Sequence, residues 1–223
     1  MISYNSQKFN NLIKQISQIL KVNNIDSTDS EIKIPTKISE LITSKIQLCI
    51  EPADNFLSEK CPKCGKTHFT VFSSSYFRNV IFKIDNLLIK IKVAIPRLIC
   101  TNCNSTHAVL PEFCIPLKQY SKQAILEIAS IASKSSSQAV ADVLNIDSKQ
   151  VRRFINLVKK QINAVNLLKN ILNFKFKNFT KLHTFIKYLP KNISKIYFEN
   201  FNTIFLYELS NRNLYLRYAK LSI

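Results

Sequence analysis

The motif C-x-x-C occurs twice in this chain, at Cys61–Cys64 and again at Cys100–Cys103. Each motif places two sulfur ligands on one short turn, and structural zinc sites join two such turns into a tetrahedral set of four ligands. The chain between the turns must then fold back on itself. The spacing therefore predicts a zinc ribbon in which Zn²⁺ has a structural role and is bound by Cys61, Cys64, Cys100 and Cys103.

The segment between the two turns has the composition of a β-hairpin. Residues 68–84 and 87–100 are rich in β-branched and aromatic residues, and polar and apolar residues alternate in the second half. Asp85-Asn86 lies between them and tolerates the positive φ angles of a two-residue turn. We expect this hairpin to bring the two cysteine pairs together.

The position of glycine supports the same site. The chain contains one glycine, Gly65, which directly follows Cys64, and Asn104 has the equivalent place after Cys103. The backbone after the second cysteine of such a turn often enters the left-handed region, where Gly is best tolerated and Asn next. Both turns are therefore predicted to have the same backbone conformation.

Other readings of these residues are weaker. A redox-active C-x-x-C does not account for two pairs at ribbon spacing, and a catalytic zinc would need an open fourth position. His68 and His107 follow the two turns at matching positions and are alternative ligands, but four thiolates already complete the shell. Cys49 and Cys114 lie outside the pattern and are expected to be buried thiols.

Helical periodicity dominates the rest of the chain. Apolar residues recur at helical spacing in a set of segments, which we predict as helices: residues 4–22, 36–47, 119–133, 137–144, 148–170 and 179–189. The fold class is therefore α+β, mainly helical, with a β-hairpin zinc ribbon followed by a helix-turn-helix bundle. We expect an N-terminal helical segment (1–57), the ribbon (58–117), a helix-turn-helix domain (118–170) and a basic, aromatic C-terminal segment (171–223).

Residues 137–156 fit the template of a DNA-binding helix-turn-helix. Such a motif needs a small residue where its helices cross, a residue tolerant of positive φ at the turn, and apolar residues facing inward. Ala141 and Asn145 meet the first two needs, and the inward positions are filled by Val140, Leu144, Ile146, Val151 and Phe154. Ser148 is predicted to cap the second helix. The side chains predicted to contact DNA are Ser148, Lys149, Gln150, Arg152, Arg153 and Asn156. The alternative is an ordinary helical hairpin with a solvated basic face.

The chain is strongly basic, and its acidic residues are unevenly distributed along the sequence. The net charge is +18, and no acidic residue occurs from Ser148 to Tyr197. Biased lysine usage could raise the number of basic residues, but it would not remove the acids from one stretch. This distribution indicates a polyanionic partner, most simply double-stranded DNA. The longest apolar runs fall short of the ~20 residues needed to cross a bilayer, so we expect a cytoplasmic protein without membrane contacts.

The run C-x-x-C-x-x-x-H-A-V-L-P-x-F-x-x-P-x-x-x-Y-S, from Cys100 to Ser121, follows a C-P-x-C-G turn. Together they resemble the zinc-ribbon and helix-turn-helix proteins of bacterial mobile elements, a poorly characterised, transposase-related group. The resemblance covers about residues 58–160. It implies a bacterial origin and a role in recognising the DNA of the element.

The sequence does not predict an enzyme. Two-metal cleavage of DNA needs a cluster of acidic ligands, and the only acids after Asp147 are Glu199 and Glu208. Tyrosine and serine recombinases need clustered arginines, but only Arg212 and Arg217 follow Arg153. We therefore expect a DNA-binding protein, either a mobile-element factor that works with a separate transposase subunit or a transcription regulator. A catalytic enzyme with unrecognised acids is the third possibility.

Overall fold

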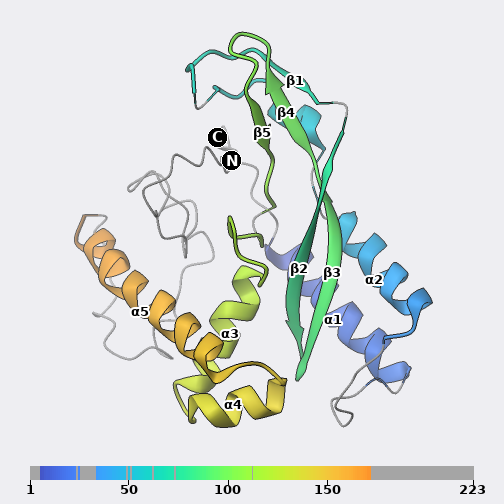
Figure 1. Ribbon diagram of the computed structural model, residues 1–223, viewed down its shortest axis with the longest axis vertical. Coiled ribbons are helices and arrows are strands. Elements are labelled where there is room, and N and C mark those ends of the chain that lie inside the picture. The colour runs from blue at the N-terminus through green and yellow to red at the C-terminus, as the bar shows by residue number, and fades with distance from the viewer. Residues whose placement is uncertain are drawn as a thin grey trace.

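The computed structural model describes residues 6–23, 25, 34–48, 50, 52–61, 63–72, 74–111 and 113–171. Its fold is α+β, as predicted (Figure 1). The elements in chain order are α1 (Ser6–Val22), α2 (Thr36–Gln47), the 3-10 helix η1 (Ala53–Phe56), β1 (Phe69–Val71), β2 (Tyr76–Ile84), β3 (Leu87–Ile95), β4 (Arg97–Cys100), β5 (Thr106–Ala108), α3 (Lys122–Ala132), α4 (Ser137–Leu144) and α5 (Ser148–Ile171). The predicted helix at 179–189 lies outside the described residues.

The long antiparallel hairpin β2–β3 runs through the centre of the molecule (Figure 1). Its register runs from Tyr76 opposite Ile95 to Ile84 opposite Leu87. Asp85 has a φ of 50°, which confirms the turn predicted at this position. Buried side chains alternate with more exposed ones along β3, so one face of the β2–β3 hairpin packs into the core.

The hairpin is shorter than predicted, because each of its strands is interrupted before it reaches a cysteine turn. Pro96 separates β3 from β4, and proline has no N–H with which to continue the strand pairing. The outer pieces form a second sheet in the order β1-β4-β5, where Phe69 lies opposite Cys100. The cysteine turns are therefore joined by this small sheet rather than by the hairpin itself.

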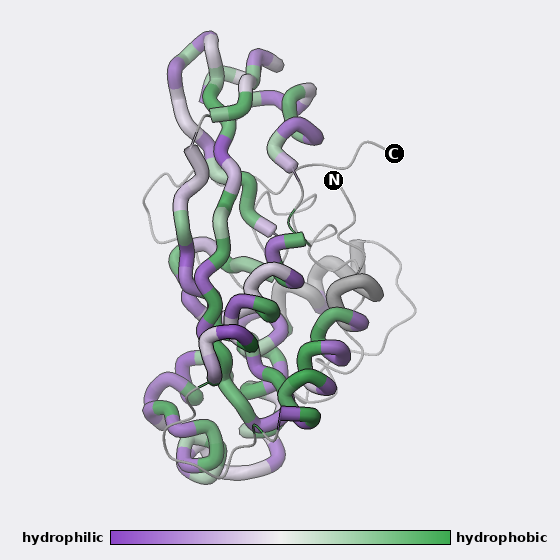
Figure 2. The backbone as a smooth tube through the Cα atoms, turned by 90° about the vertical axis from the view of Figure 1, so that its right-hand side faces the viewer, coloured by the Kyte–Doolittle hydropathy of each residue, from purple (hydrophilic) through white to green (hydrophobic). Residues whose placement is uncertain are grey.

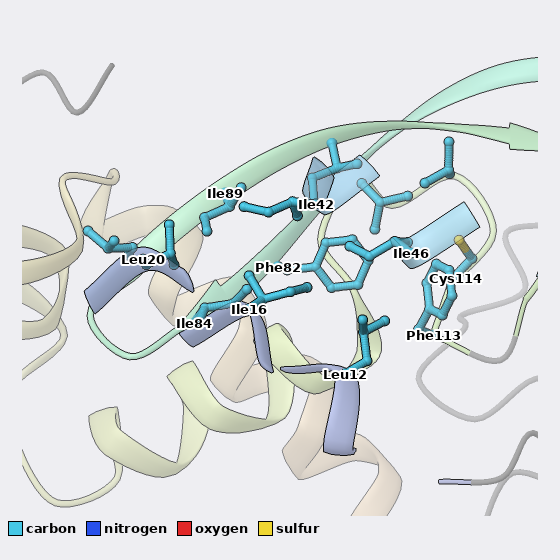
Figure 3. Close-up of a cluster of buried hydrophobic side chains, with 14 of the residues drawn as sticks. Leu12, Ile16, Leu20, Ile42, Ile46, Phe82, Ile84, Ile89, Phe113 and Cys114 are labelled. Atoms are coloured by element: carbon cyan, nitrogen blue, oxygen red, sulfur yellow. The ribbon is translucent and has the colours of Figure 1, made fainter. Parts of the chain in front are cut away.

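Helices α1 and α2 pack against the hairpin and form the larger core with it. Figure 3 shows Leu12, Ile16 and Leu20 of α1 and Ile42 and Ile46 of α2 gathered around the buried β2 and β3 side chains. The side-chain amide of Gln47 also donates to the carbonyl of Ala94 at 3.1 Å and accepts from its N–H at 2.9 Å. These two bonds satisfy the N–H and carbonyl of Ala94, which would otherwise need a neighbouring strand as their partner.

Helix α3 starts later than the predicted 119–133, because Gln119 and Tyr120 pair with β2 instead. The N–H of Ile81 donates to Gln119 at 2.7 Å, and the N–H of Ser121 donates back to Ile81 at 2.9 Å. Ser121 then caps the helix by accepting from the N–H of Ala124. The buried Lys83 ammonium lies 3.5 Å from a Glu127 carboxylate oxygen, which ties α3 to the hairpin.

Hydrophobic and hydrophilic residues are interleaved along the helices (Figure 2). No helix within the described ranges combines the length and the apolar character that crossing a membrane requires.

Candidate metal centre and basic helix face

The four cysteines of the two C-x-x-C turns lie together, with all their sulfur atoms within 4.8 Å of one another. The sulfur of Cys61 is 3.7 Å from that of Cys103, and the sulfur of Cys64 is 3.6 Å from that of Cys100. Four thiolates at about 2.3 Å from one tetrahedral ion would be about 3.8 Å apart. The donor set and its spacing therefore fit a single tetrahedral metal ion.

The two turns have the same backbone hydrogen bonds. The N–H of Gly65 donates to the carbonyl of Cys61 at 2.8 Å, and the N–H of Asn104 donates to Cys100 at 2.8 Å. The φ angles are 75° at Gly65 and 52° at Asn104, so the predicted left-handed conformation is confirmed in both turns. The backbone thus presents two sulfur atoms from each turn to the same point.

The two histidines have different surroundings. The ring of His107 is buried, its Nε2 lies 3.5 Å from the sulfur of Cys61, and the ring packs edge-on against Phe69. The His68 residue is exposed, and its carbonyl accepts from the N–H of Thr101. The matching positions of His68 and His107 after the two turns made both residues candidate ligands. In the structure only the His107 ring is placed beside a cysteine, within the residues described.

The pKa values of the cysteines differ, because the thiols differ in burial and in hydrogen bonding. Burial raises the pKa of Cys61 to about 11, whereas the hydrogen bond with the Ser105 side chain lowers the pKa of Cys103 to about 6. A backbone hydrogen bond from Lys66 lowers the pKa of Cys64. The half-buried Cys64 and Cys103 therefore ionise more readily than Cys61, and the thiolate is the form that binds a metal ion.

A small hydrophobic core surrounds this site. Its buried residues are Ala53, Phe56, Cys61, Phe69, Leu98 and Cys100. Such packing favours a structural ion over a catalytic one, because it surrounds the buried ligands with apolar groups. Cys114 is buried in the larger core, as predicted, and Cys49 lies outside the described residues.

Helices α4 and α5 meet at a tight turn. Asn145 has left-handed angles, φ 49° and ψ 53°, and the N–H of Ile146 donates to the carbonyl of Ala141 at 3.0 Å. Ala141, the small residue predicted at the helix crossing, is 2% exposed. The other inward positions are also buried at Val140, Leu144, Val151 and Phe154, whereas Ile146 is half-buried.

The cap of α5 differs from the prediction. A carboxylate oxygen of Asp147, rather than the Ser148 hydroxyl, accepts from the N–H of Lys149 at 2.7 Å. Helix α5 begins at Ser148, so Asp147 is the residue that precedes the first turn and can reach its free N–H groups. Ser148 is half-buried within the first turn.

The predicted DNA-contacting residues of α5 lie along one side of the helix. Lys149, Arg152, Arg153 and Asn156 are exposed, and Gln150 is half-buried. The exposed stripe continues through Lys159 and Lys160, which the helix-turn-helix template did not include. Their helical spacing from Arg152 and Asn156 was the signal that would have identified them.

A family described as a domain of unknown function (DUF6431) matches residues 61–154. The matched range begins at the first cysteine of the site and ends within α5. Neither the curated proteins nor the solved structures contain a significant match to this chain.

Proposed function

We propose that this protein is a sequence-specific double-stranded DNA-binding protein of a mobile element, related to transposases but without a catalytic domain of its own. The exposed basic stripe on α5, directly after the Asn145 turn, is the observation that carries the proposal. Arginine can read guanine, asparagine and glutamine can read adenine, and lysine can contact phosphate. A separate transposase subunit would then supply catalysis.

Zinc is the proposed ion of the four-cysteine site. It favours a closed tetrahedral set of thiolates, and such a site contributes folding energy of about 10–16 kcal/mol in small modules. Metal analysis of the purified protein should give one zinc per chain, and Cys100→Ser should reduce that content. If the small core around Cys61 and Cys100 stays folded with no bound metal, this part of the proposal is wrong.

The DNA proposal is tested by measuring binding to the ends of the element and to unrelated duplexes of the same length. Replacing both Arg152 and Arg153 by Ala should abolish the preference for the specific site while leaving the fold intact. A matched control removes two exposed lysines elsewhere, Lys37 on α2 and Lys90 on β3. If both double variants bind alike, α5 is not the recognition helix.

A transcription regulator is the second candidate, since the same α5 stripe would serve it equally. Binding to the terminal inverted repeats favours the mobile-element role, whereas binding to the protein's own promoter favours regulation. Metal-dependent nicking of supercoiled DNA that is lost in Glu199→Ala would instead indicate an enzyme. We expect no such nicking.

A further inference from the structure

A groove of about 620 Å³ borders the basic stripe of α5. One wall is the loop from Leu117 to Tyr120, and the other is a row of α5 side chains that includes Arg153, Asn156 and Lys160. Arg153 and Asn156 are also among the proposed base-contacting residues, so the groove is continuous with that face. If α5 reads a duplex as proposed, the flank of that duplex would pass along this groove.

The charged residues described along the groove are all basic. Lys118 approaches from the loop, and Arg153 and Lys160 approach from α5, and none of the described residues that line the groove is acidic. Leu117 adds an exposed apolar side chain at the rim, with 68% of its surface accessible. Cations on two opposing walls suit a polyanion that lies between them, and the apolar rim suits the carbon atoms of deoxyribose.

The loop wall is fixed in place by β2. The Arg78 guanidinium donates to the carbonyls of both Ile115 and Lys118, and the N–H of Lys118 donates to Ile115 at 3.1 Å. Leu117 is held at a φ of 59°, which is uncommon for a leucine. Because these bonds define the backbone of the loop before any ligand arrives, only the Lys118 side chain has to be ordered on binding.

The floor of the groove is aromatic and packed. The rings of Tyr120 and Phe154 meet edge to face with their centroids 4.8 Å apart. A tyrosine hydroxyl is already neutral at physiological pH, and burial raises the pKa of Tyr120 further, so the floor adds no negative charge that would repel an anion.

We infer that this groove is a second DNA contact, which holds a phosphodiester backbone of the duplex between Lys118 of the loop and Lys160 of α5. The inference rests on the proposed function. It assigns the loop a role independent of base sequence: the loop sets the position of α5 on the duplex, and α5 reads the bases.

The test compares Lys118→Ala, Lys160→Ala and the double variant with wild type, using specific and unrelated duplexes over a range of salt concentrations. Each single variant should weaken binding to both duplexes by the same factor. Each should also reduce the slope of log affinity against log salt by about 1. The preference for the specific duplex should not change.

Lys37→Ala is the matched control, because it removes one exposed lysine from α2, outside the groove. If Lys118→Ala and Lys160→Ala change the salt slope no more than Lys37→Ala does, the groove is not a phosphate contact. That result would leave the proposed function standing, provided that the Arg152 and Arg153 double variant still loses its preference. If wild-type protein binds no DNA, the proposed function fails, and the groove assignment fails with it.

Discussion

Gly65 and Asn104 have equivalent positions in the two cysteine turns. Each follows the second cysteine, each has a positive φ, and each donates its N–H to the first cysteine of its turn. Two different residues thus produce one backbone shape, because glycine and asparagine both tolerate the left-handed region. The equivalence allows the conformational requirement to be tested separately from the ligands.

Replacing Gly65 by Ala should weaken metal binding by about fivefold, which corresponds to about 1 kcal/mol. A Cβ added at Gly65 would meet no atom within 4 Å, so the cost comes from the backbone conformation alone. Competition with a chromophoric chelator measures the change. Gly65→Asn is the control and should bind almost as tightly as wild type, whereas equal losses in both variants would contradict the conformational explanation.

Removal of the metal should expose the four clustered cysteines to alkylation but leave Cys114 protected. Cys114 is buried in the core shared by α1, α2 and the hairpin, and burial raises its pKa to about 12. At pH 8 this thiol therefore remains protonated, and the neutral form is a poor nucleophile. Peptide mapping after iodoacetamide treatment with a chelator measures the pattern, and unfolding in urea supplies the positive control. Labelling of Cys114 together with the four others would show that both cores open at once.

Asp147→Ala should destabilise the protein by about 1 kcal/mol, because the N–H of Lys149 loses its carboxylate acceptor. Ser148→Ala should change stability by less than about 0.5 kcal/mol, a size typical of substitutions that remove no specific interaction. Urea denaturation of the two variants measures the difference. If Ser148→Ala loses more stability than Asp147→Ala, Ser148 rather than Asp147 is the N-cap of α5.

Ala141→Leu should destabilise the α4–α5 pair by about 1–3 kcal/mol, because Ala141 is buried and a larger side chain would overpack its position. Ala139→Leu adds the same atoms at an exposed position of α4 and should have little effect. The midpoint of denaturation and the affinity for DNA should fall together in the first variant. Equal stability of the two variants would mean that the helices cross elsewhere.

The features that sequence predicted best depend on local conformation. Gly65, Asn104 and Asn145 all adopt the positive φ expected from their residue types and their places in turns. The inward positions of α4 and α5 also followed from spacing, because one buried face imposes a fixed period on a helix.

The features that were missed depend on partners distant in the sequence. Tyr120 continues a helical pattern, yet its neighbours pair with Ile81 of β2. Arg78 gives no local sign that its guanidinium will hold the carbonyls of Ile115 and Lys118. The groove beside α5 was therefore not predictable, since one of its walls exists only after β2 and the loop have met.

Within the part of the chain that the structure describes, the core around Cys61 and Cys100 shares no buried residue with the larger core, although Ala108 of β5 packs against the larger one. Apart from changes at Ala108, substitutions in the small core should therefore have little effect on the packing of the larger core. The small metal-binding core can then vary in sequence, or be exchanged for that of a relative, without changes to the helices of the larger core.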